Sequence, residues 1–389
     1  MKLIKILSFI MALAAVNSII SFTPATPQFI YYGFMLILLF LGISKSNNRI
    51  SFLIIWLLIA SGISLALNDI AEYYNPLGRF LVFLLGILVL SPMLRGTYIN
   101  QIKIHLFKYT NIFLLLITFL SFLGKITAAY SVYDYASLFS GITTGSMIMA
   151  PIAGVSLLIC CWKIYEDNIH KRTKYYFIIL ATTSLFCLIL AGSRAALMGA
   201  LLAVLFLFMK LFRGRLTKMV QVLVFILFVL AVTSPIWLSY TETLTTKMEF
   251  AESQGDQFSS RADLWDYRIQ EFTESPVFGI GFANSHYGLI DTATGNVEPG
   301  TSWGAILAMV GLLGAMPFLI LIFRFLFHLY FDKINKLNSA FLLGILIFFI
   351  VHWFAEGYML AAGSFLFFYA WLSLGVMQVY KDTKKIVVL

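Results

Sequence analysis

Long apolar runs separated by short polar segments alternate along almost the whole chain. Each run holds enough apolar residues to cross a bilayer as a helix, for which about 17–25 residues are needed. The twelve runs lie near 3–22, 29–45, 50–67, 78–94, 110–130, 145–162, 175–192, 195–212, 219–240, 303–327, 339–354 and 359–380. Because lipid offers backbone groups no hydrogen-bond partner, each run is predicted to be helical. The pattern predicts an all-α integral membrane protein with about twelve transmembrane helices.

The composition supports a protein whose surface faces lipid. Hydrophobic residues make up 60% and charged residues 12% of the 389 residues, whereas a soluble domain is about half apolar and a quarter charged. The formal net charge of +9 would suit a nucleic-acid binder only if the cations formed one basic face, and here they are scattered between apolar runs. We therefore expect membrane lipid, and no nucleic acid, among the partners.

Lysine and arginine are concentrated in alternate connections between the runs. With both termini in the cytoplasm, 21 of the 27 Lys and Arg residues fall on the cytoplasmic side, as the positive-inside rule requires. The first run follows two lysines like a signal peptide, but its apolar part is long for a cleaved leader. The six cations left on the outer side are Arg79, Lys125, Arg194, Lys247, Arg261 and Arg268.

One connection is far longer than the others. Residues 241–302 separate the ninth run from the tenth on the outer side, and structureless loops beyond about 15 residues are uncommon unless they are functional. Residues 260–274 begin with a capping box and repeat apolar residues at helical spacing. We expect a short amphipathic helix on the outer membrane surface, anchored among acyl chains by Leu264, Trp265 and Phe272.

Three of the outer arginines are candidates for binding an anion. Arg194 lies where the seventh and eighth runs meet with almost no loop, and an arginine at membrane depth costs at least ~2.5–3.5 kcal/mol on insertion scales. Arg261 and Arg268 are seven residues apart, close to two helical turns, so they share one face. Three guanidiniums so placed can hold a diphosphate bidentately.

Each arginine also has a structural alternative. Arg194 could extend its charged end to the membrane boundary while its stem stays among apolar groups. The arginines of the predicted surface helix could instead pair with acids three or four residues away, which are Asp263, Asp266 and Glu271.

Three groups near the outer face are candidate general bases. Glu298 precedes Pro299, which imposes an extended approach, and Thr301 or Ser302 is expected to cap the tenth helix. The free N–H groups of that helix would form an anion site beside Glu298, and a carboxylate there can act as a general base. Glu356 and His286 are weaker candidates, and all three could be ordinary exposed or structural groups.

Four segments, taken in their order along the chain, resemble the Wzy/O-antigen ligase superfamily. They are Gly192–Ala196, Ser260–Trp265, Ser275–Gly281 and Gly311–Gly314, the last with the sequence Gly-Leu-Leu-Gly. Arg268, followed after ten residues by Gly279, also resembles the Arg-X10-Gly pattern of Wzy polymerases. The resemblance covers about residues 180–375 of a single polytopic domain, 1–389.

The resemblance implies a metal-independent glycosyltransferase of a GT-C-like class in the bacterial inner membrane, with its active site facing the periplasm. Its substrates would be undecaprenyl-diphosphate-linked oligosaccharides, with Arg194, Arg261 and Arg268 on the diphosphate and Glu298 as the first candidate base. We expect a polymerase of lipid-linked repeat units in surface polysaccharide biosynthesis, with a chain-length-regulating co-polymerase as a further partner. The chain has no Walker loop, dinucleotide fingerprint, HExxH or DxD motif, so we expect neither metal nor cofactor.

Two other functions stay open. O-antigen ligases carry a histidine followed by Asn, Ser or Gln, eleven residues before the first glycine of the Gly-X-X-Gly motif, and that slot here is Gly300. The missing histidine favours a polymerase over a ligase that passes the glycan to lipid A core or to a protein. A flippase for the same lipid-linked sugars would more often show repeated halves, and the two halves of this chain are not self-similar.

The orientation can be tested with single cysteines in a cysteine-free background. We expect residues 241–302 to react with a membrane-impermeant thiol reagent from outside, and residues 163–174, 210–218 and 331–338 to react only after the membrane is opened. Labelling of the long loop only from the cytoplasm would contradict the orientation.

Overall fold

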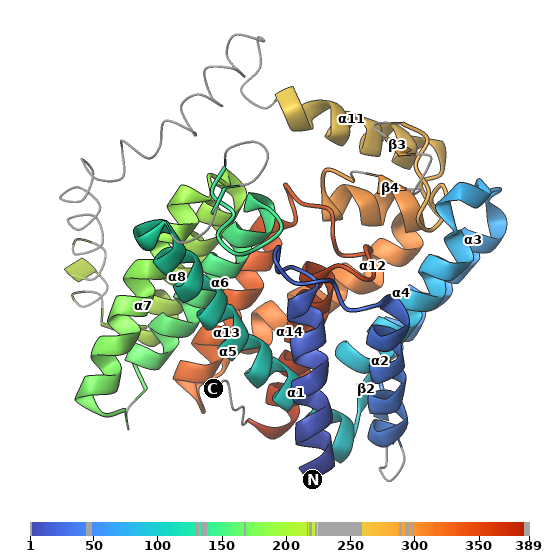
Figure 1. Cartoon of the computed structure of the whole chain (residues 1–389). Coiled ribbons are helices and arrows are strands. Elements are labelled where there is room, and N and C mark those ends of the chain that lie inside the picture. The colour runs from blue at the N-terminus through green and yellow to red at the C-terminus, as the bar shows by residue number, and fades with distance from the viewer. Residues whose placement is uncertain are drawn as a thin grey trace.

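The computed structural model of the chain is a bundle of apolar helices, with the first turn of α1 and the last turn of α14 at the same end (Figure 1). It describes residues 2–43, 49–128, 132–133, 138–166, 169–215, 217, 220–221, 224, 259–287, 290–291, 296–297 and 299–384. The ninth predicted run falls mainly outside these residues. Arg261 belongs to a described helix, but its side chain and all of Glu298 lie outside the described part.

The other eleven predicted runs each correspond to a helix. These helices are α1 (Lys2–Asn17), α2 (Gln28–Ile43), α3 (Phe52–Leu67), α4 (Pro76–Leu90), α5 (Thr97–Thr127), α6 (Ser146–Ile164), α7 (Lys171–Leu190), α8 (Arg194–Leu211), α12 (Ser302–Phe331), α13 (Lys336–His352) and α14 (Phe365–Thr383). A single 3-10 turn, η1 (Glu72–Tyr74), leads into α4. The described strands are two-residue pairs, β1 (Arg49–Ile50) with β2 (Leu94–Arg95) and β3 (Ile290–Asp291) with β4 (Asn296–Val297).

Length and apolar composition allow six of the described segments to cross a membrane: Glu72–Leu90, α5, α6, α7, α8 and α12. Three more helices, α2, α3 and α13, are apolar but shorter. The prediction of an all-α membrane protein is therefore confirmed. Twelve spans and a GT-C-like arrangement stay predictions.

Small residues let the helices of the bundle approach closely. Gly154 of α6 and Gly199 of α8 both lie against Phe348 of α13, and a Cβ at Gly199 would stand only 3.2 Å from the Phe348 carbonyl oxygen. Such contacts are typical of membrane helices, where packing and hydrogen bonds replace the hydrophobic effect as the force between helices. They hold α6, α8 and α13 together as neighbours.

Two buried lysines lie at the end of the bundle where α14 ends. Lys103 donates to the carbonyls of Ser91 and Leu94 at 2.6 and 2.7 Å. Lys210 donates to the carbonyls of Tyr330 and Asp332, both at 2.5 Å. These carbonyls follow α4 and end α12, where a helix leaves its last C=O groups unpaired and favours a cation.

A helix is present where the sequence predicts one, as α11 (Ser259–Glu274), which lies across the end of the bundle opposite to the first turn of α1 (Figure 1). It packs on α12. Arg268 and Glu271 are buried on this helix, while Trp265 and Ile269 are exposed, and the anchoring of its apolar residues among acyl chains stays a prediction. Packing against α12, which sequence periodicity cannot show, decided which face turned inward.

Helix α12 is broken at Gly311, whose φ of 59° and ψ of −169° are not helical. Residues 276–280, which follow α11 after Ser275, fill the break. The Ile280 N–H donates to the Ala308 carbonyl at 2.9 Å, and the Leu312 and Leu313 N–H groups donate to the carbonyls of Pro276 and Val277 at 2.8 and 3.1 Å. Groups that an unbroken helix would pair internally are thus paired with the loop.

Two glycines make this close approach possible. Gly279 has a φ of 77°, and a Cβ there would lie 2.5 Å from the Met309 carbonyl oxygen. A Cβ at Gly311 would lie 2.5 Å from the carbonyl carbon of Val277. Positive φ and lack of space both require glycine at these positions. The two motif segments Ser275–Gly281 and Gly311–Gly314 are therefore in direct contact.

We expect Gly279→Ala to destabilise the protein by more than ~1 kcal/mol, because alanine is strained at this φ and would collide with α12. The measurement is the melting temperature of the detergent-solubilised protein. Gly33→Ala is the matched control, since no atom lies within 4 Å of a Cβ at Gly33. Equal melting temperatures for the two variants would show that the loop does not depend on this contact.

Candidate functional site

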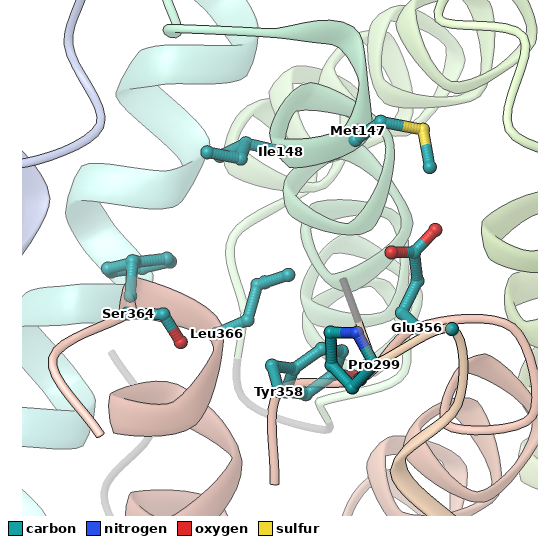
Figure 2. A pocket seen from close by; sticks show the side chains of 10 residues that line it. Met147, Ile148, Pro299, Glu356, Tyr358, Ser364 and Leu366 are labelled. Carbon is teal, nitrogen blue, oxygen red and sulfur yellow. The ribbon is translucent and has the colours of Figure 1, made fainter. Parts of the chain in front are cut away.

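A cavity of about 220 Å³ opens at the α11 end of the bundle. Its walls come from the first turn of α6, the residues before α12, the connection between α13 and α14, and the first turn of α14 (Figure 2). The lining residues are Met147, Ile148, Pro299, Gly300, Glu356, Gly357, Tyr358, Ser364, Phe365 and Leu366.

Glu356 is the one acidic side chain among these lining residues. Its carboxylate lies between Pro299 and Met147, while Ile148, Ser364 and Leu366 form the other side of the cavity (Figure 2). Of the predicted bases, Glu356 therefore lines the cavity. Glu298 lies outside the described residues, but Pro299, which follows it directly, is part of the wall.

Ser302 holds the Glu356 loop in place. Its hydroxyl donates to the Glu356 carbonyl at 2.6 Å and accepts from the Tyr358 N–H at 3.0 Å. Its own N–H donates to the carbonyls of Trp353 and Glu356 at 2.9 and 3.1 Å. Thr301 caps α12 by accepting from the Gly304 N–H at 3.4 Å. The cap expected at Thr301 or Ser302 is thus confirmed at Thr301, and Ser302 instead holds the loop that carries Glu356.

Below the loop, aromatic and imidazole groups fill the interior. Tyr358 is 5% exposed, and its hydroxyl lies 3.0 Å from Nδ1 of the fully buried His352. Trp353 is also fully buried and packs edge-on against Trp303 of α12. These contacts give the wall that carries Glu356 a rigid base.

Several helices begin at this end of the bundle. The first turns of α6 and α14 and the residues before α12 line the cavity. α8 begins here too, because it packs along α13 with Gly199 against Phe348, four residues before α13 ends. Each helix N-terminus carries a partial positive charge and unpaired N–H groups. Their convergence favours an anion.

Arg194 is the first residue of α8, and its side chain is exposed. The tight turn before it has Gly192 at a φ of 66°, and Ser193 caps the helix by accepting from the Ala196 N–H. Arg194 adds a cation to a helix terminus that is already positive, an arrangement that favours a bound anion. It lies at the same end of the bundle as Glu356.

Arg268 is almost completely buried, with 3% of its surface exposed, and forms an ion pair with Glu271 at 2.6 Å. It also donates to the Ser285 hydroxyl at 3.1 Å. The Ser285 hydroxyl in turn donates to the other Glu271 oxygen at 2.7 Å. Burial lowers the pKa of the Arg268 guanidinium, and the charge of Glu271 opposes this change. The helix-pairing alternative thus describes the geometry of Arg268, and diphosphate binding by this residue stays a prediction.

His286 lies on the exposed side of the same network rather than in the cavity. Its Nδ1 is 2.6 Å from Oε2 of Glu274, with 44% of the histidine and 36% of the glutamate side chain exposed. The Tyr287 hydroxyl donates to Oε1 of Glu274 at 2.7 Å. The hydrogen bond from Tyr287 and the neighbouring His286 hold the pKa of the Glu274 carboxyl below its ordinary value.

Ser302, Glu271 and Ser285 organise the site, but sequence reasoning assigned no such function to any of them. Ser302 could be placed only as a possible helix cap, and Glu271 only as one of three possible partners for arginine. The hydrogen bond between Ser302 and Glu356 joins residues 54 positions apart in the sequence, and the one between Ser285 and Glu271 joins residues 14 positions apart. The sequence offered only a local signal for these residues, namely the spacing of three residues between Arg268 and Glu271.

Within the described residues, no group of three or more His, Cys, Asp or Glu side chains is placed to hold a metal ion. Residues 178–319 match the model of the Wzy_C family, described as O-antigen ligase. The match includes α8, α11 and the broken part of α12. No curated protein matches the chain. The match over residues 178–319 supports the Wzy/O-antigen ligase superfamily, as the motifs of the sequence indicated.

Proposed function

We propose that the chain polymerises undecaprenyl-diphosphate-linked oligosaccharide repeat units. The family indicates a transferase of lipid-linked polysaccharide, and the cavity beside Glu356 provides a place for the reaction. The observation that carries the choice of a polymerase is Gly300, which stands in the slot that a ligase fills with histidine. Its φ is 67°, and a Cβ there would lie 2.6 Å from Cβ of Leu264. The backbone at this slot has no room for an imidazole.

The proposed reaction is one glycosyl transfer. A hydroxyl of one lipid-linked repeat attacks the anomeric carbon of a growing glycan that is still attached to its lipid diphosphate. The new glycosidic C–O bond forms as the bond between the anomeric carbon and the diphosphate oxygen breaks. The hydroxyl proton passes to the base, and the lipid diphosphate leaves with the bonding electrons. The leaving group supplies the driving force, so we propose a metal-independent enzyme.

Glu356 and Glu298 are the two proposed bases. Glu356 is supported by its position in the cavity wall, and Glu298 by its place next to Pro299 of the same wall. The helix N-termini around the cavity favour the ionised form of either carboxylate. A carboxylate is a weak base, which suffices where the transition state has strong oxocarbenium character and the attacking hydroxyl becomes acidic. His286, outside the cavity, is the weakest of the three candidates.

The proposed diphosphate site uses the positive end of the bundle. Arg194 and the helix N-termini would stabilise the charge that develops on the leaving diphosphate. Arg261 is proposed as a second ligand from α11. Arg268 is proposed as a third diphosphate ligand. Because it already pairs with Glu271, it would bind the diphosphate through N–H groups that do not contact Glu271 or Ser285.

The proposed setting is the bacterial inner membrane, with both termini in the cytoplasm, residues 241–302 and the active site on the periplasmic side, and a chain-length-regulating co-polymerase as a partner. A ligase is the second candidate, because the family model that matches is described as O-antigen ligase. Purified protein given only lipid-linked repeats distinguishes the two. A polymerase extends the glycan on lipid, whereas a ligase makes product only when lipid A core or an acceptor protein is added.

We expect Glu356→Gln to lower the rate of polymerisation by ~10²–10⁴ while binding of the lipid-linked donor is retained, if Glu356 is the general base. Glu298→Gln is the matched comparison, because it removes one charge from the adjoining segment. The measurement is turnover of purified lipid-linked repeats, with donor binding followed separately. A near-normal rate for Glu356→Gln together with a large loss for Glu298→Gln would move the base to Glu298.

Arg194→Ala should reduce polymerisation about 10- to 100-fold, because the enzyme loses one charge-assisted contact to the substrate. Lysine should rescue poorly, since it cannot form the bidentate contact. Arg268→Ala should behave differently and lower the melting temperature, because it leaves Glu271 buried and unpaired at a cost of about 3–5 kcal/mol. Normal polymer from a stable Arg194→Ala protein would remove Arg194 from the site.

A further inference from the structure

A group of exposed and half-buried aromatic and polar side chains lies on α11 and the loop after it, and none of them lines the cavity. The rings of Tyr267 and Tyr287 are stacked, with centroids 5.9 Å apart and planes 21° apart. Beside them, Glu274 accepts from the Tyr287 hydroxyl and pairs with His286. Tyr287 is 37% exposed, so an aromatic face and a carboxylate are available together. We call Tyr267, Glu274, His286 and Tyr287 the glycan shelf.

The glycan shelf rests on a rigid buried support. Glu271 is fully buried, and one of its oxygens accepts from the Ser285 hydroxyl at 2.7 Å and from the His286 N–H at 2.8 Å. The Ser285 carbonyl accepts from the hydroxyl of Tyr74, also buried, at 2.7 Å. Arg268 neutralises Glu271. The backbone that carries His286 and Tyr287 is therefore held in place before any ligand arrives, which reduces the entropy cost of binding.

The chemistry of the shelf fits a sugar ring. A pyranose has one face rich in C–H groups, which packs on a flat aromatic side chain, and hydroxyls around its edge that seek charged acceptors. Tyrosine offers a large rigid surface with a polar end, and hydrogen bonds to a carboxylate are stronger than those between neutral groups. Glu274 holds its negative charge readily, because Tyr287 and His286 keep the pKa of its carboxyl low.

We propose that the glycan shelf binds sugar rings of the growing polysaccharide at a site separate from the catalytic cavity. This inference rests on the proposed polymerase function and specifies where its glycan lies. None of the four shelf residues lines the cavity, while α11 also packs on α12, which begins beside the cavity. A chain held at both places stays near the active site after each transfer, which raises its effective concentration for the next one.

The shelf can be tested by direct binding. The probe is the lipid-free oligosaccharide that mild acid releases from the lipid-linked repeats of the host cell, titrated against the full chain in detergent. We expect Tyr287→Ala to weaken oligosaccharide binding at least about tenfold, because the shelf loses an aromatic face and the hydrogen bond that orients the Glu274 carboxylate. Tyr287→Phe, which keeps the ring, should lose less. Tyr175→Ala, which removes a tyrosine that is 66% exposed on α7, is the matched control and should bind normally.

The same variants should separate the shelf from the catalytic cavity. In Tyr287→Ala we expect a shorter polymer but an unchanged rate for the first transfer between two single repeats, with an unchanged melting temperature. Equal oligosaccharide binding by Tyr287→Ala and Tyr175→Ala would overturn the shelf. If the wild-type chain instead transfers glycan only to lipid A core or protein, the polymerase proposal fails, and the oligosaccharide titration still decides whether the shelf binds sugar.

Discussion

The break in α12 at Gly311 is the constraint on which the α11 end of the structure depends. A helix broken inside an apolar bundle leaves N–H and C=O groups without partners, and such groups cost several kcal/mol each in a medium without water. Residues 276–280 satisfy them from one side, and Ser64 of α3 donates to the Met309 carbonyl at 2.6 Å from another. The loop and the helix are therefore one unit, and α11, which leads into the loop, is positioned by it.

Side chains at the start of α12 likewise satisfy backbone groups of a distant segment, here in the candidate site. Ser302 satisfies the backbone groups of the loop that carries Glu356, while Arg268, Glu271 and Ser285 satisfy one another under α11. Gly300 and Gly304 let Leu264 and Arg268 of α11 approach α12 closely. One helix, α12, thus supports the cavity on one side and the proposed glycan shelf on the other.

The charged residues under α11 differ from those near the cavity in their surroundings. Arg268 is neutralised internally, and the pair is buried where an unpaired charge would be very costly. Arg194 stands at an exposed helix start, where its charge adds to that of the helix terminus. Glu356 lines the cavity, on a loop whose backbone is held by Ser302. The pair of Arg268 and Glu271 thus stabilises the fold, while Arg194 and Glu356 belong to the candidate site.

Local sequence patterns by themselves predicted eleven of the described apolar helices, the helix within residues 260–274 and a helix cap at Thr301 or Ser302, because each depends on residues within a few positions of one another. The order of short motifs along the chain, a property of sequence alone, indicated the superfamily whose family model matches residues 178–319. Only the tertiary structure decided that Ser275–Gly281 enters the break at Gly311, that Arg268 turns toward Glu271 and that Glu356 reaches the cavity. Those outcomes depend on which backbone groups α12 leaves unpaired and which distant segment satisfies them, and no local pattern records that pairing.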